Sequence, residues 1–124
     1  MSWSETFLKL LKDNDVRLIT YVPDNVLTPL IAGVNADNYF LPVTATREDE
    51  AIGTVSGAYV AGLRGAVMMQ TSGFALIANA LASLVLPYQI PTVMVISERG
   101  TLGEFTALDA KRARQYADRR GNQH

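Results

Sequence analysis

The chain has 124 residues, 48% of them hydrophobic and 19% charged, with a formal net charge of −1 and no cysteine, so it can bury one core of its own. The even charge balance argues against a nucleic-acid partner, and the lack of cysteine excludes disulfides, thiolate catalysis and cysteine metal sites. The first residues lack the basic flank and apolar run of a secretory signal, so we expect a cytoplasmic protein without a membrane span.

Helical and extended patterns alternate along the first half of the chain. Ser2 and Glu5 have the spacing of a capping box ahead of an amphipathic stretch. The predicted elements here are a helix ending near Asn14, a strand over residues 18–22, a turn over 23–25, a short helix ended by Gly33 and Asn35, and a strand over 39–43.

The second half begins with a helix over residues 48–62 that contains unusually many alanines and glycines. We expect Ile52, Val55 and Tyr59 to share one face, and the small residues to pack closely against the sheet. A strand over 66–70, a helix over 73–86 and a strand over 92–96 complete the pattern. Both strands are continuous apolar runs, which is typical of parallel strands covered on both faces. The alternation predicts an α/β fold with a doubly wound, mostly parallel sheet and helices on both faces.

The predicted helix over residues 73–86 is apolar almost all round, yet too short to span a membrane. A helix without a polar face must be covered on both sides. In so small a domain the second cover is most simply another subunit, which makes this helix an association surface. The alternative is a central core helix.

Glu48 occupies the point where the second predicted strand gives way to a helix. Open α/β sheets bind ligands at this carboxyl edge, where the loops starting at Pro23, Thr46 and Gln70 also converge. A structural alternative is open, because acidic residues favour a first helical turn and Thr46 with Asp49 fits a capping box. No glycine-rich nucleotide fingerprint or Walker A sequence is present, and the sole histidine, His124, is the last residue.

Three segments carry a family resemblance: Val22-Pro23-Asp24, the run from Arg47 through Gly62, and Met69 through Gly73 with Asn79 through Leu84. The later Ser97-Glu98-Arg99-Gly100, with Gly103-Glu104, also matches. With them the chain resembles the pyrimidine-binding (PYR) domain of thiamine diphosphate enzymes, and most closely the sulfopyruvate decarboxylase alpha subunits and phosphonopyruvate decarboxylases. The resemblance implies a flavodoxin-like PYR domain over residues 1–105, followed by a basic C-terminal helix or tail over 106–124.

The resemblance also implies roles for particular residues. Glu48 matches the family's catalytic glutamate, which hydrogen-bonds N1′ of the cofactor's aminopyrimidine and promotes proton loss from thiazolium C2. The residues implied to bind cofactor are Glu48, Gln70, Thr71, Ser72 and Gly73, and those implied to bind substrate are Asp24 and Asn25. None is implied to bind metal.

The family's diphosphate half carries Gly-Asp-Gly and a later Asn that hold Mg²⁺ and the diphosphate, and this chain has no such sequence. The resemblance therefore implies thiamine diphosphate and Mg²⁺ shared with a beta-type diphosphate-binding subunit in a homo- or hetero-oligomer. The implied reaction is decarboxylation of a small 2-oxo acid, 3-sulfopyruvate or a similar 3-substituted pyruvate. The alternative is a degenerate, non-catalytic assembly or regulatory subunit, because Ala75 and Leu76 stand where the family has Gly-Asn.

Overall fold

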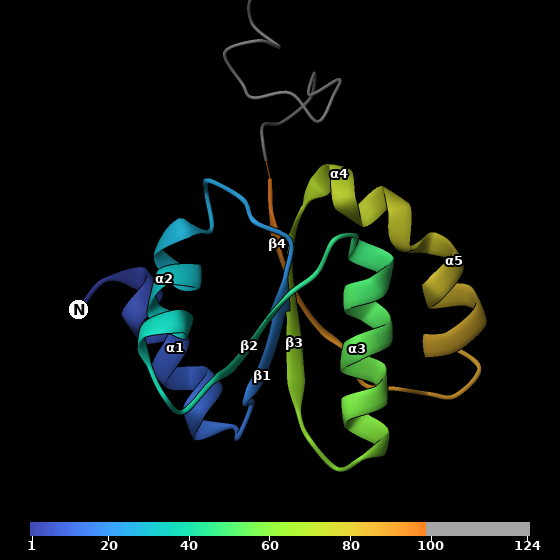
Figure 1. Cartoon of the computed structure of the whole chain (residues 1–124), viewed down its shortest axis with the longest axis horizontal. Helices are drawn as coiled ribbons and strands as arrows, with labels where there is room; N and C mark the ends of the chain where they lie inside the picture. The colour runs from blue at the N-terminus through green and yellow to red at the C-terminus, as the bar shows by residue number, and fades with distance from the viewer. Residues whose placement is uncertain (99–124) are drawn as a thin grey trace, which may run out of the picture.

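The computed structural model describes residues 1–98, which form a parallel sheet between two layers of helices (Figure 1). The strands are β1 (Leu18–Tyr21), β2 (Leu41–Thr44), β3 (Gly65–Gln70) and β4 (Val93–Ser97). They lie in the order β2-β1-β3-β4, and every neighbouring pair is parallel. The prediction of a flavodoxin-like, doubly wound sheet is confirmed. The proposed boundary at residues 105 and 106 lies outside the described residues.

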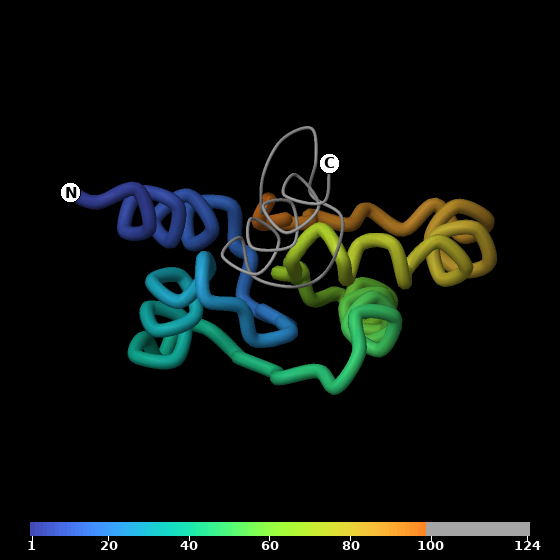
Figure 2. Tube along the Cα trace, turned by 90° about the horizontal axis from the view of Figure 1, so that it is seen from above, coloured from blue at the N-terminus to red at the C-terminus, as the bar shows by residue number. Residues whose placement is uncertain are grey.

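Helices cover both faces of the sheet, as the view from above shows (Figure 2). On one side lie α1 (Trp3–Asp13) and α2 (Thr28–Ala36). On the other lie α3 (Glu48–Val60) and a helical run over residues 71–85. Because side chains alternate along a strand, Ile19 packs under α1 and α2, whereas Leu18 packs under α3. Fully burying a side chain such as Ile19 stabilises the fold by about 1.5–3 kcal/mol.

The first helix follows its sequence signals. The Ser2 hydroxyl accepts a hydrogen bond from the backbone N–H of Glu5 at 3.3 Å, and the Glu5 carboxylate accepts one from Ser2 N at 2.8 Å. The predicted capping box and the end at Asn14 are therefore confirmed. Gly33 does not end the second helix, contrary to the prediction. It lies inside α2, where a Cβ atom would overlap the side chain of Leu8, so this glycine permits close packing of α2 on α1.

Two predictions for the start and the glycines of α3 are wrong. The N-cap residue is Arg47, without a side-chain capping bond, so Thr46 and Asp49 do not form a capping box. The Asp49 carboxylate instead accepts hydrogen bonds from Glu50 N and from Arg47 Nε. The glycines Gly53 and Gly57 face open space rather than the sheet.

The buried face of α3 explains this outcome. Ala51, Ile52 and Val55 form its apolar stripe, and all three are buried. Tyr59 is exposed, contrary to its predicted place on the same face. Because a helix buries its most apolar stripe, Gly53 and Gly57 are left on the outer side, whereas the small residues Ala51 and Ser56 are buried as the sequence predicts.

The helical run over residues 71–85 is not the single helix that the sequence predicts. It consists of α4 (Thr71–Phe74), a 3-10 turn η1 (Ala75–Ile77), α5 (Ala78–Ala80) and a π-helical turn η2 (Leu81–Val85). Ile77 is buried, whereas Phe74, Leu76 and Leu86 are exposed. The core-helix alternative is therefore wrong. The prediction that β4 is covered on both faces is wrong as well, since Val93 and Ile96 are exposed on this edge strand.

Candidate functional site

The carboxyl ends of all four strands meet at one edge of the sheet. The chain moves to opposite sides after β1 and after β3, so these neighbouring strands flank the point where the strand order reverses. Such a switch point leaves a crevice at the carboxyl edge of an open parallel sheet. Asp24 follows β1, Glu48 starts the helix after β2, and Gln70 ends β3. The topology thus brings the predicted site loops to a common edge.

Glu48 lies against Gly73. It is the first residue of α3 and only 7% exposed. A Cβ atom at Gly73 would lie 2.5 Å from Glu48 Cγ and would overlap the carboxylate, so only glycine leaves room for this side chain. Among residues 1–98 the Glu48 carboxylate has no hydrogen bond or ion pair. A buried acid without a partner is costly in an ordinary protein interior and is characteristic of a site that receives a ligand.

The other predicted cofactor residues lie at the end of β3 and in the first turn of α4, directly before Gly73. Gln70 is the last residue of β3, and its buried side-chain oxygen has no hydrogen-bond partner within the described part of the chain. Thr71 already uses its hydroxyl, which donates to the carbonyl oxygen of Ser97 at 2.9 Å. Ser72 is half-buried in the first turn of α4. Of the predicted cofactor residues, Gly73 is the one that contacts the Glu48 carboxylate.

Asp24, predicted to bind substrate, accepts hydrogen bonds from within the protein. Its carboxylate is buried and accepts hydrogen bonds from the backbone N–H groups of Val26 at 3.1 Å and Leu27 at 3.4 Å. The same oxygen accepts a hydrogen bond from the hydroxyl of Ser97 at 2.8 Å. Ser97 was not among the predicted site residues. Its position at the end of a parallel strand, beside the other loops, was the signal that pointed to it.

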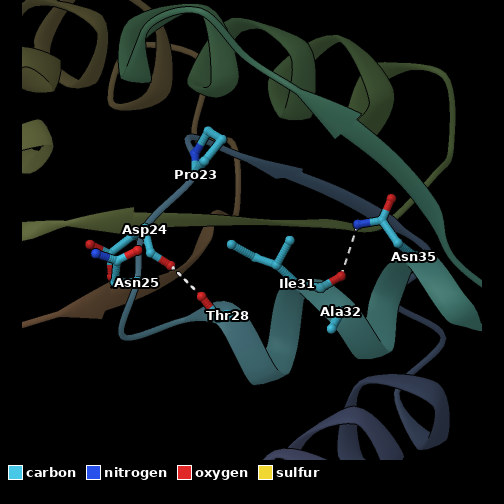
Figure 3. Close-up of a pocket in the computed structure, with 7 residues that line it drawn as sticks. All are labelled: Pro23, Asp24, Asn25, Thr28, Ile31, Ala32 and Asn35. Carbon is cyan, nitrogen blue, oxygen red and sulfur yellow. Dashed lines mark hydrogen bonds between the residues drawn. The ribbon is translucent and has the colours of Figure 1, made fainter.

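A cavity of about 360 Å³ opens beside Asp24, between the β1–α2 loop and α2 (Figure 3). Its lining residues are Pro23, Asp24, Asn25, Thr28, Ile31, Ala32 and Asn35. Hydrogen bonds from Thr28 to the Asp24 carbonyl and from Asn35 to the Ile31 carbonyl hold its walls. Glu48 does not line this cavity. The structure therefore brings Asp24 and Asn25 together, and Glu48 and Gly73 together, as two neighbouring parts of one sheet edge.

Within residues 1–98, no three histidine, cysteine or acidic side chains gather in a way that would hold a metal ion. In the same residues, no helix is long and apolar enough to cross a bilayer.

Comparisons with known proteins give a consistent set of relatives, although no family model matches the chain. The sulfopyruvate decarboxylase subunit alpha of Methanocaldococcus jannaschii is 41% identical over 104 residues, which are 84% of this chain and 62% of that protein. The corresponding subunit of Methanothermobacter thermautotrophicus is 37% identical over 115 residues, covering 93% and 70%. The phosphonopyruvate decarboxylase of Streptomyces viridochromogenes is 38% identical over 89 residues, covering 72% and 22%. The chain thus spans about three fifths of the length of the first relative.

Proposed function

Because the chain belongs to the family of sulfopyruvate decarboxylase alpha subunits, we propose that it is the pyrimidine-binding subunit of a thiamine-diphosphate-dependent 2-oxo acid decarboxylase. The proposed substrate is 3-sulfopyruvate or a similar 3-substituted pyruvate, in keeping with the names of these relatives. The observation that carries the proposal is the buried Glu48 carboxylate, which lies against Gly73 with no partner among residues 1–98.

The corner around Glu48 fits an aminopyrimidine. The edge of such a ring offers a basic nitrogen and an exocyclic amino group. The Glu48 carboxyl group would hydrogen-bond to the ring nitrogen, because it has no other partner among residues 1–98. Gly73 leaves the space that this arrangement needs. When bound, the cofactor supplies the electron sink for loss of CO₂.

A partner chain is part of the proposal. The matched relatives are named as alpha subunits, and the described residues offer no acidic cluster for a metal ion. In the Streptomyces relative the matching region is only 22% of the protein, so most of that decarboxylase lies outside it. We therefore assign Mg²⁺ and the cofactor's diphosphate to a beta-type subunit. This chain contributes Glu48 and the pyrimidine side of the site.

The alternative of a non-catalytic relic rests on Ala75 and Leu76. Alanine in place of glycine disrupts a loop when the backbone requires positive φ. Ala75 has φ −63° and ψ −25°, an ordinary helical conformation, so its side chain causes no backbone strain. Leu76 is exposed rather than wedged into the corner. The structural argument for a damaged loop is thus weakened.

Purification of the native complex through a tag on this chain tests the proposal. The complex should contain thiamine diphosphate and a second type of chain, and should release CO₂ from 3-sulfopyruvate in the presence of Mg²⁺. The isolated chain should bind the cofactor weakly and release no CO₂, because the diphosphate and metal contacts lie on the partner. A complex that binds cofactor but turns over neither 3-sulfopyruvate nor another 2-oxo acid would favour the regulatory alternative.

A further inference from the structure

Ser97 connects the loop after β1 with the turn after β3. It is the last residue of β4 and 5% exposed. Its hydroxyl donates to Asp24, 73 positions away, at 2.8 Å. Its carbonyl oxygen accepts from the Thr71 hydroxyl at 2.9 Å. One residue on the edge strand therefore holds the loop after β1 and the turn after β3.

The bond to Asp24 reaches across the end of an intervening strand. β1 and β4 both pair with β3, so two inter-strand steps of about 4.8 Å each separate them. The β1–α2 loop must lean over β3 for Asp24 to reach Ser97. The Asp24 carboxylate also accepts hydrogen bonds from the N–H groups of Val26 and Leu27. Its position therefore fixes the loop that lines one side of the cavity.

The bond to Thr71 acts on the other part of the site. Thr71 begins α4, and Gly73 is two residues further along. Glu48 fits only because Gly73 has no side chain, so a shift of this turn moves the surface against which the Glu48 carboxylate rests. The anchor at Ser97 therefore helps to set the Glu48 corner.

We infer that Ser97 is a positioning residue, with separate links to the cavity through Asp24 and to the Glu48 corner through Thr71. The inference rests on the proposed function for its kinetic consequences, and on the two hydrogen bonds for its structural ones. Loss of the Asp24 link should act mainly on substrate binding at the cavity. Loss of the Thr71 link should act mainly on the proton transfer assigned to Glu48.

Two substitutions separate the links. Ser97→Ala removes the hydroxyl that binds Asp24 but keeps the carbonyl that Thr71 needs, whereas Thr71→Val removes the hydroxyl of Thr71 with little change in shape. In the purified complex, Ser97→Ala should raise KM about tenfold with a smaller change in kcat, and Thr71→Val should lower kcat about tenfold with a smaller change in KM. Ser97→Thr and Thr71→Ser retain the hydroxyls and should restore most of the activity.

Amide hydrogen exchange gives a readout that needs neither cofactor nor substrate. In the full chain, Ser97→Ala should accelerate exchange of the Val26 and Leu27 amides about tenfold, because both are bonded to the Asp24 carboxylate. The controls are Ser4→Ala, which removes a buried serine hydroxyl in α1, and Thr6→Val, which removes an exposed threonine hydroxyl there. Neither control should change the exchange rate of these amides, and neither should change KM and kcat by different factors.

The outcomes separate this inference from the proposed function. Unchanged exchange at Val26 and Leu27 in Ser97→Ala overturns the positioning role, whatever the activity. The same changes in KM and kcat in both variants also overturn it, because the two hydrogen bonds would then not act on separate steps. A wild-type complex without decarboxylase activity contradicts the proposed function alone, and the exchange result then decides the role of Ser97.

Discussion

Glu48 and Glu50 carry the same carboxyl group and lie two residues apart, but only Glu48 is buried. Glu48 lies against Gly73 with 7% of its surface exposed, whereas Glu50 is exposed on the outside of the first turn of α3. Helical geometry turns neighbouring positions to different sides. The sequence motif contains both acids, but only one of them faces the corner where a cofactor would lie.

Substitution of the two glutamates tests this difference. Glu48→Gln in the purified complex should reduce kcat on the order of 10²-fold, because glutamine cannot exchange a proton with a bound ring. Glu50→Gln is the matched control and should retain nearly full activity, measured as CO₂ release from 3-sulfopyruvate. Equal effects of the two substitutions would show that Glu48 is not the proton-transfer group.

Asp37, at the opposite edge of the sheet, makes a pH-dependent contribution to the free energy of unfolding. The hydrogen bond from Lys12, and then that from the backbone N–H of Tyr39, lowers the pKa of Asp37 below its usual value of 3.8. With the folded pKa below the unfolded one, the stabilisation is present above about pH 3.8 and is lost as the pH falls through the folded value.

Denaturant titrations at a series of acidic pH values measure this contribution. The free energy of unfolding should fall less steeply with acid in Asp37→Asn than in the wild type. Because the pair is exposed to solvent, the difference should be small and should shrink at high salt. A wild type and a variant with the same pH dependence at low salt would contradict the assignment.

At the scale of elements, α3 shows how tertiary contacts give the same residue type opposite roles. Gly57 has no atom within 4 Å of a potential Cβ, so nothing in the described structure requires a glycine there. Gly73, just after β3, has the Glu48 side chain in that position. The first glycine weakens a helix, and the second makes room for a buried acid.

Alanine substitutions distinguish these two glycines. Gly57→Ala should stabilise the isolated chain by about 1 kcal/mol, because alanine is the better helix former and the position is open. Gly73→Ala should destabilise it by about 1–3 kcal/mol through overpacking against Glu48. Denaturant unfolding measures both. If Gly57→Ala lowered the activity of the complex without lowering stability, the outer face of α3 would instead be a contact surface.

At the scale of the whole molecule, apolar side chains remain uncovered near the candidate site. Phe74 and Leu76 are exposed at the start of the helical run over residues 71–85, directly after Gly73. This location agrees with the sequence-based expectation of an association surface and with the proposed need for a partner. Exposed apolar patches on a folded chain mark contact surfaces for other chains.

A matched pair of leucines tests the association surface. Leu76 and Leu10 are each 52% exposed, but Leu10 lies on α1, across the sheet. Leu76→Asp should weaken the complex with the partner chain at least tenfold, because a charge would be buried at the interface. Leu10→Asp should leave assembly unchanged. Sedimentation velocity of the mixed chains measures both, and equal behaviour of the two variants would place the interface elsewhere.

The sequence by itself determined the local features and the class of fold. The capping box of Ser2 and Glu5, the four strands and the alternation of strands with helices were predicted, because hydrophobic periodicity and capping bonds depend on residues within a few positions of each other. It also placed Glu48 at a carboxyl edge, because parallel strands bring their ends together.

The tertiary structure decided which groups meet. The sequence did not predict that Gly73 lies under Glu48 or that Gly53 and Gly57 face outwards. Nor did it predict that the run over residues 71–85 breaks into short turns, or that Ser97 holds Asp24 and Thr71. These contacts join residues as many as 73 positions apart. They depend on the strand order and on which helix stripe is most apolar, and both are set by the competition of all elements for one core.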